Sequence, residues 1–246
     1  MTIEHDNDLI GLRRAGALVA RVLREMGKAV APGVRPVELD EIAQRAFREA
    51  GATSAPQKAY QFPGATCISV NSSLAHGVSS RKPLREGDLI NIDVSAELDG
   101  YWADTGGSFP VGNVKSRLRR LLKSTRKARD EAVAEVRAGR PLNVIGRAVQ
   151  RRAKRDGFQV IRNLGGHGVG RFIHEEPHVS NISNPLDRTK LKEGWVLAVE
   201  PFLTTGARNV VEDADGWTLK TPDGTLGAQF EHTIVVTQGE PIILTL

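Results

Sequence analysis

Apolar residues recur on one face of two predicted helices, with the helical period of about 3.6 residues. The first stripe is Leu12, Val19, Val22 and Met26, and the second is Leu121, Ala128, Ala132 and Val136. Pro32 and Gly33 follow the first stripe, and this pair ends a helix because neither residue favours its continuation. The chain therefore opens each of its two halves with an amphipathic helix.

After each of these helices the chain repeats a longer pattern. Segments 33–51 and 139–157 both run from a glycine through Arg-Pro and an amphipathic helix to a final glycine. Segments 86–93 and 193–200 both begin with Glu-Gly, continue with alternating apolar residues and end on a carboxylate. Alternation with a period of two predicts strands, so Asp93 and Glu200 are expected at equivalent strand positions.

This repeat predicts an α+β fold made of two related halves. Each half runs helix, helix and then strands, with the helices segregated from a mainly antiparallel sheet. We expect one domain over residues 1–246, with halves of roughly 1–114 and 115–246 related by a pseudo-twofold axis around a central sheet. Equivalent strands that meet near the axis would bring carboxylates from both halves into one site.

Four carboxylates fall on the predicted strands. A turn at Asp99-Gly100 folds the segment between Asp93 and Asp104 into a hairpin, which brings these two side chains together. Glu231 enters a β-branched run typical of a buried strand, and Glu200 is followed by Pro201, which ends its strand beside a cleft. Carboxylates gathered in this way repel one another unless a cation lies between them, so the pattern favours a metal site over isolated surface residues.

Two histidines lie in glycine-rich or small-residue segments. His76 stands between Ala75 and Gly77, and His167 lies within the glycine-rich run 165–170. Small neighbours allow a ligand to approach, and neutral imidazole binds transition metals well. For each histidine a hydrogen-bonded structural role is an equal alternative on these grounds.

Two motifs are rejected as misleading. Residues 174–178 read His-Glu-Glu-Pro-His and fit the zinc-protease pattern H-E-x-x-H, but Pro177 disrupts the helix that this pattern requires. The glycines of 165–170 resemble a phosphate-binding loop, yet no helix signal follows them.

Composition narrows the setting. The 246 residues are 40% hydrophobic and include one cysteine, Cys67, so an internal disulfide is impossible and a cytoplasmic location is expected. No apolar run has membrane-spanning length, and the polar N-terminal segment does not resemble a signal peptide. Basic clusters at 117–120, 126–129 and 151–155 contribute to the net charge of +5. We interpret them as solvated helix faces, with attachment to ribosomal RNA as the alternative.

A set of motifs distributed over nearly the whole chain resembles the type I methionine aminopeptidases. The motifs are Asn91-Ile-Asp93, Gly100-Tyr-Trp-Ala-Asp104-Thr, Gly166-His167-Gly-Val-Gly-Arg171, His174-Glu-Glu-Pro177, Val199-Glu200-Pro201, Asp215-Gly-Trp217-Thr and Gln229-Phe-Glu231-His232-Thr. Any one of them is weak evidence, but the set is specific. The resemblance implies the pita-bread fold, in agreement with the internal repeat.

The resemblance also implies a centre with two divalent metals. Asp93 would chelate one metal, Asp104 and Glu231 would bridge the pair, and His167 and Glu200 would bind the other. Oxygen-rich ligation with one imidazole suits Mn, Fe(II), Co or Zn, and the order of affinities does not choose among them. A monovalent-cation site near Asn71, Ser73 and Gly227 is implied in the same way.

The implied reaction removes the N-terminal methionine from nascent polypeptides, with a small second residue preferred. Glu200 would accept and donate a proton, while His76 and His174 would position the peptide and assist the developing charge. We expect the enzyme to act as a monomer.

The implied pocket for the methionine side chain contains Tyr60, Phe62, Cys67 and Trp217, whose aromatic and sulfur groups suit a thioether. The sequence departs from the family pattern beside this pocket. Ile173 stands where Phe or Trp usually precedes the histidine, Phe172 comes one position earlier, and the segment from Tyr60 to Phe62 is one residue shorter than usual. The resemblance therefore leaves the shape of the pocket open.

Two other functions are compatible with the same fold. A prolidase or proline aminopeptidase would share all five metal ligands, although such relatives usually carry an additional N-terminal domain. A non-catalytic pita-bread protein that binds a partner through its basic surface would be free to lose ligands, whereas this chain retains all five. Methionine excision is the favoured interpretation.

Overall fold

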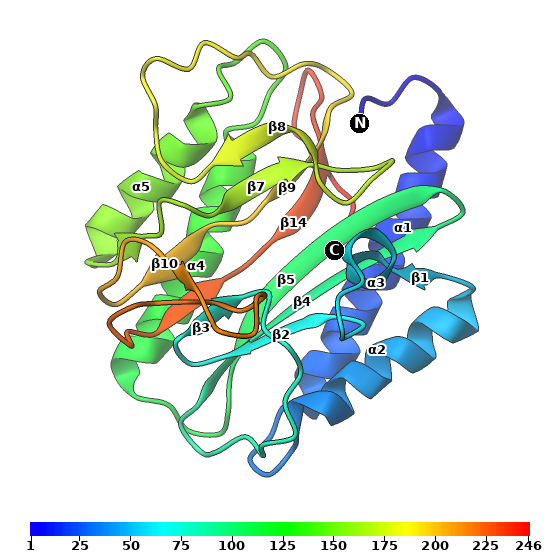
Figure 1. The fold of residues 1–246 in the computed structure, drawn as a ribbon. Helices are drawn as coiled ribbons and strands as arrows, with labels where there is room; N and C mark the ends of the chain where they lie inside the picture. Colours follow the sequence, from blue (N-terminus) through cyan, green and yellow to red (C-terminus); the bar gives the residue numbers. More distant parts are fainter.

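The computed structural model describes residues 1–246, with helices on the outside and strands between them (Figure 1). The helices are α1 (Asp6–Ala29), α2 (Pro36–Ala50), α3 (Ala55–Tyr60), α4 (Ser116–Ala134) and α5 (Val144–Asp156). All strand pairs are antiparallel. The α+β prediction is confirmed.

The strands form two larger and two smaller sheets. The sheet of the first half contains β1 (Thr53–Ser54), β2 (Cys67–Val70), β4 (Leu89–Leu98) and β5 (Tyr101–Pro110). The sheet of the second half has the order β15 (Ile242–Ile243), β14 (His232–Val235), β9 (Val196–Val199), β7 (Gly165–Gly168) and β8 (Glu175–Ser180). In one small sheet the strand order is β13 (Gly227–Gln229), β10 (Phe202–Thr204) and β6 (Gln159–Val160). In the other it is β11 (Val211–Glu212), β12 (Leu219–Lys220) and β3 (Ser73–Ala75).

Glycines end the two repeated helices as predicted. Gly51 and Gly157 follow α2 and α5 with φ of 66° and 77°, a left-handed conformation that glycine adopts without a steric penalty. The beginnings of these helices differ. Pro36 is the first residue of α2, whereas Pro141 pairs with Lys190 in a β-bridge and α5 starts only at Val144.

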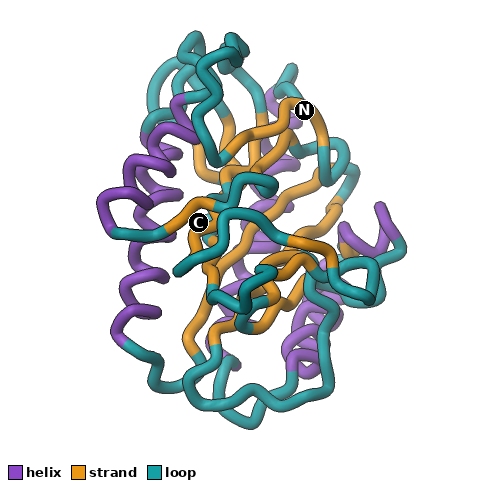
Figure 2. The backbone as a smooth tube through the Cα atoms, turned by 60° about the vertical axis from the view of Figure 1, so that its left-hand side comes forward, coloured by secondary structure: helices purple, strands orange, loops and turns teal.

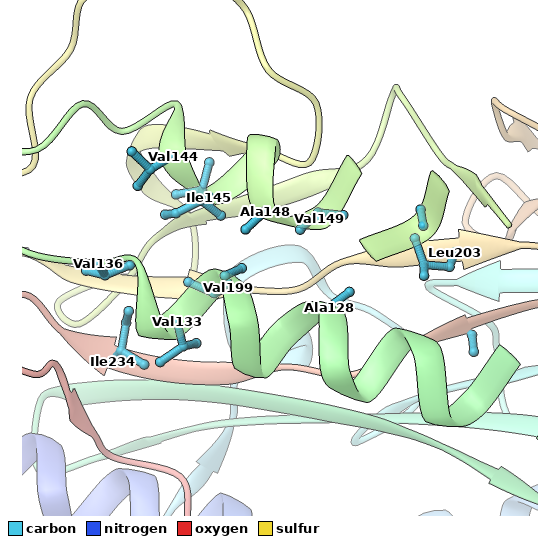
Figure 3. Close-up of a cluster of buried hydrophobic side chains, with 14 of the residues drawn as sticks. Ala128, Val133, Val136, Val144, Ile145, Ala148, Val149, Val199, Leu203 and Ile234 are labelled. Carbon is cyan, nitrogen blue, oxygen red and sulfur yellow. The ribbon is translucent and has the colours of Figure 1, made fainter. Parts of the chain in front are cut away.

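The helices of each half cover their own strands with apolar side chains. All eight residues of the two predicted stripes are fully buried. In Figure 2 the strands lie between the helical layers. Figure 3 shows the core of the second half, where Val133 and Ile145 of the helical layer face strand residues that include Val199 and Ile234. The first half has an equivalent core beneath α1 and α2.

The two halves join where β5 meets the segment before β14. Gly107 and Phe230 form a β-bridge, and the Glu231 amide donates to the Gly106 carbonyl at 2.9 Å. The Thr233 hydroxyl donates to the carbonyl of Asp104 at 2.7 Å. Backbone from both halves is thus fixed at the centre, where two of the predicted metal-binding residues, Asp104 and Glu231, take part in these bonds.

Three basic residues of α5 are paired within the protein. Arg152 and Arg155 form ion pairs with Glu131, and Arg151 pairs with Glu135. Arg151 and Arg155 are exposed, in agreement with a solvated helix face, whereas the Arg152 side chain is buried against α4. None of the helices has the combination of length and apolar character needed for a membrane crossing.

The core of the second half provides a test of the fold. We expect Leu121→Ala to lower the free energy of unfolding by about 2–5 kcal/mol, because Leu121 is fully buried and its truncation leaves a cavity. The matched change Leu186→Ala removes a side chain that is 86% exposed and should cost less than about 0.5 kcal/mol. Urea unfolding of both variants measures the difference, and equal losses would contradict the assigned core.

Candidate metal centre and adjoining pocket

The hairpin places Asp93 and Asp104 on the same face of the sheet. Asp93 of β4 pairs with Gly106, and Asp104 of β5 pairs with Ser95. The two carboxylates are therefore diagonal neighbours, since residues two apart in a strand face the same side. The predicted turn at Asp99 and Gly100 joins these strands, and both residues have positive φ.

The second half contributes an imidazole and two carboxylates. His167 lies in β7, Glu200 directly follows β9, and Glu231 lies between β13 and β14. The His167 Nδ1 atom is 2.9 Å from the carbonyl oxygen of Gly168, so Nδ1–H donates there and Nε2 keeps its lone pair. That Nε2 lies 3.7 Å from Glu200 Oε1 and 3.8 Å from Asp104 Oδ2.

All five predicted metal-binding residues gather in one region. Ligand atoms of Asp104, His167 and Glu231 lie within 4.8 Å of one another. Asp93 and Glu200 stand outside that tightest group but line, together with Asp104 and His167, a cavity of about 410 Å³. Residues from both halves thus surround the same space.

The electrostatics of this cluster fit divalent cations. Burial raises the pKa of Asp104, Glu200 and Glu231 well above the usual carboxyl range, and neighbouring carboxylates raise each of them further. Asp104 Oδ1 and Glu231 Oε1 are buried without any hydrogen-bond partner. Burial lowers the pKa of His167 to about 3, so its imidazole is neutral and free to coordinate. Unpartnered carboxylate oxygens beside a neutral imidazole are the donor set that a Mn, Fe, Co or Zn ion accepts.

A polar network behind the cluster holds Glu231 in place. The Gln229 side-chain amide donates to Glu231 Oε2 at 3.0 Å and accepts from Asn91 Nδ2 at 3.2 Å. These two residues were not among the predicted site residues. Their spacing carried the signal. Asn91 and Gln229 each precede a predicted ligand by two positions, and in an extended segment side chains two positions apart lie on the same side.

An apolar pocket of about 250 Å³ adjoins the carboxylates. Its lining includes the four predicted residues Tyr60, Phe62, Cys67 and Trp217, and also Ile173. The rings of Phe62 and Trp217 meet edge to face, with centroids 5.2 Å apart. Asp93, Asp104, His76 and His174 belong to the lining of both cavities, so the pocket opens directly onto the cluster.

The departure from the family pattern can be located in this pocket. Ile173 is 3% exposed and lines the pocket, whereas Phe172 is 41% exposed. Phe172 packs outside against Tyr60 and Trp102, with centroid distances of 6.3 and 5.2 Å. An aliphatic side chain therefore occupies the wall position, and the neighbouring aromatic ring covers the outer side.

The two remaining histidines stand between the cavities. His76 has φ of 51°, a conformation that non-glycine residues adopt rarely and that is enriched at functional sites. His174 Nδ1 lies 2.6 Å from the Tyr60 hydroxyl, and desolvation with His76 nearby lowers the pKa of His174 to about 4. Residues 175–180 form β8, so the H-E-x-x-H pattern is not helical, as predicted.

The segments predicted for a monovalent cation lie on adjoining elements. Ser73 belongs to β3 and Gly227 to β13, and these strands contact each other. The side chain of Asn71 accepts from the Leu89 amide and donates to Asp88. The cation site itself remains a prediction.

Comparisons with known proteins agree with this geometry. The profile of metallopeptidase family M24 matches residues 11–238. Methionine aminopeptidase 2 of Bacillus subtilis is 47% identical, over 100% of this chain and 99% of that protein. The methionine aminopeptidase structure from Rickettsia prowazekii is 37% identical with a TM-score of 0.95, over the full length of both chains.

A more distant similarity extends to the fold alone. The prolidase structure from Pyrococcus horikoshii is 22% identical with a TM-score of 0.77, and the match covers 63% of that chain. The full-length matches described above, at higher identity, are to methionine aminopeptidases, and the pita-bread fold implied by the resemblance is confirmed. The chain belongs to metallopeptidase family M24.

Proposed function

We propose that this protein removes the N-terminal methionine from polypeptides by metal-dependent hydrolysis, with a preference for a small second residue. One observation carries the proposal most directly. The cavity lined by buried carboxylates and an imidazole shares four lining residues with an apolar pocket of a size suited to one side chain. An exopeptidase needs this arrangement, because the terminal side chain must be bound next to the bond that is cleaved.

The metal ligands in this proposal come from both halves, and residues 1–246 act as one catalytic unit. Asp93 would hold one ion, Asp104 and Glu231 would lie between two ions, and His167 and Glu200 would hold the second. Such ions supply Lewis acidity and a nucleophilic water near neutral pH. Mn, Fe(II), Co and Zn all accept carboxylate oxygens together with one imidazole.

The side chains of the pocket would bind and orient the substrate. Tyr60, Phe62 and Trp217 offer aromatic surface to the thioether, and Cys67 and Ile173 complete the wall. His174, held by Tyr60, would donate a hydrogen bond to the reacting carbonyl oxygen from its Nε2 atom, and His76 would orient the peptide. Glu200 would accept a proton at a carboxylate oxygen and return it to the leaving amine.

The biological setting follows from this substrate class. Nascent polypeptides are made in the cytoplasm, so we place the reaction there, with the enzyme as a monomer. The basic residues of α4 and α5 that remain outside the described ion pairs are available for ribosomal RNA, whose contacts would weaken steeply with salt.

A peptide panel tests the reaction. After reconstitution with each of the four metals, we expect rapid release of methionine from Met-Ala-Ser and slow release from Met-Lys-Ser, measured by chromatography of the products. Ala-Pro-Ser should remain intact. Preferential cleavage before proline would indicate a prolidase-like enzyme, and no cleavage with any of the metals would indicate a non-catalytic protein.

Asp104 tests the metal-binding assignment. We expect Asp104→Asn to weaken metal affinity by at least about tenfold, measured by calorimetry, because an anionic ligand is lost. In metal-free protein the same change should leave the melting temperature equal or higher, since Asp104 is buried against Glu231 and Asp93. The matched variant Asp99→Asn alters an exposed turn residue and should bind metal normally. Unchanged affinity in Asp104→Asn would refute the assignment.

His174 tests the catalytic assignment separately from metal binding. We expect His174→Ala to lower kcat for Met-Ala-Ser by about 10²–10⁴-fold with metal content unchanged, because a positioned donor to the reacting oxygen is removed. Tyr60→Phe should cause a smaller loss, since it removes only the hydroxyl that holds His174. Steady-state kinetics with metal analysis gives both values, and full activity of His174→Ala would overturn this role.

A further inference from the structure

Residues 170–174 connect the metal-binding strand β7 to β8 and carry two residues of the apolar pocket, Ile173 and His174. The segment contains no regular secondary structure of its own. Its position must therefore be set by contacts with other parts of the chain. A displacement of about 1 Å in a substrate-positioning group can cost about a hundredfold in rate.

Glu175 is the first residue of β8, and its carboxylate contacts this segment and the N-terminal residue. Oε1 accepts from the backbone amides of Arg171 and Phe172, each at 2.7 Å. Oε2 forms an ion pair with the amino group of Met1. The Glu175 side chain is 19% exposed, and that of Met1 is 5% exposed.

The contacts on the other side of the segment connect it to the first half. The backbone amide of Trp102 donates a hydrogen bond to the carbonyl oxygen of Gly170 at 2.9 Å. The Arg171 guanidinium donates to Asp8 at 2.7 Å and lies 4.1 Å from the ring centroid of Tyr101. The Met1 side chain packs so closely against Gly170 that an added Cβ at that glycine would lie 2.7 Å from it.

We propose that Glu175 is a positioning residue, which fixes residues 170–174 so that Ile173 forms the pocket wall and His174 faces the reacting bond. Its Oε1 atom accepts from two backbone amides of this segment, so the carboxylate is engaged in holding these residues. The length of its side chain matters more than its charge. The hydrogen bonds from the backbone amides of Arg171 and Phe172 need an acceptor oxygen at the end of a side chain with two methylene groups. This inference rests on the proposed function, since the kinetic consequences refer to peptide cleavage.

Two substitutions of Glu175 separate the effect of side-chain length from the effect of charge. Glu175→Gln keeps the length and an amide oxygen that can accept from Arg171 and Phe172, whereas Glu175→Asp keeps the charge on a side chain one carbon shorter. For Met-Ala-Ser we expect Glu175→Asp to lower kcat/KM about ten- to hundredfold, with KM raised. Glu175→Gln should stay within about threefold of the original enzyme. The reverse order, or two variants with unchanged kinetics, would overturn the proposal.

Hydrogen exchange provides a readout that does not depend on activity. The amides of Arg171 and Phe172 should exchange faster in Glu175→Asp and stay protected in Glu175→Gln. Equal exchange in both variants would exclude the positioning role even in a protein that cleaves no peptide. A wild-type protein without turnover would therefore contradict the proposed function while leaving this inference testable.

The chain offers a matched control in Glu135. Its side chain is 29% exposed and pairs with Arg140 and Arg151 on the helical side of the protein. Glu135→Asp should therefore leave kcat, KM and the exchange of residues 170–174 unchanged. Intact mass should be measured for every preparation, because Thr2 is a small second residue and loss of Met1 would move the amino group away from Glu175.

Discussion

The structure depends on a cluster of like charges that the fold buries at the junction of its two halves. Removing one carboxylate from water already costs several kcal/mol, and here Asp104 and Glu231 also lack hydrogen-bond partners for one oxygen each. The raised pKa values of Asp104, Glu200 and Glu231 express the same penalty. Bound cations remove this penalty, so metal binding and the stability of the centre are two consequences of one arrangement.

The backbone at the junction explains how the cluster is held. Neither half supplies all the side chains of the cluster, and the bonds of Gly106 with Glu231 and of Asp104 with Thr233 set the distance between the two contributions. A Cβ at Gly106 would lie 2.4 Å from the Gln229 side chain, so a larger residue there would displace the group that holds Glu231. A change that separates the two halves therefore also separates the side chains of the cluster.

Local pattern was sufficient to predict the four helices α1, α2, α4 and α5, the hairpin and the equivalence of the two halves. Helical stripes, glycine ends and alternating strands are properties of short segments, and the repeat showed that carboxylates from both halves would meet. The start of α5 was beyond this reasoning, because Pro141 is held by a bridge to Lys190 that depends on tertiary contacts. The same limit applies to the contact between Asn91 and Gln229: each stands two positions before a predicted ligand, but the two are 138 residues apart in sequence and meet only across the junction.

The pocket illustrates why family motifs predict chemistry better than shape. Metal ligands are restricted to a few side-chain types, whereas an apolar wall can be built from different residues with similar volume. In this chain the buried Ile173 forms the wall and the exposed ring of Phe172 packs against Tyr60 from outside. Tyr60, Phe62 and Trp217 still present aromatic surface to the cavity, and sulfur contacts with aromatic rings favour a thioether. The aromatic surface of the cavity is therefore supplied by Tyr60, Phe62 and Trp217 and does not depend on the residue that precedes His174.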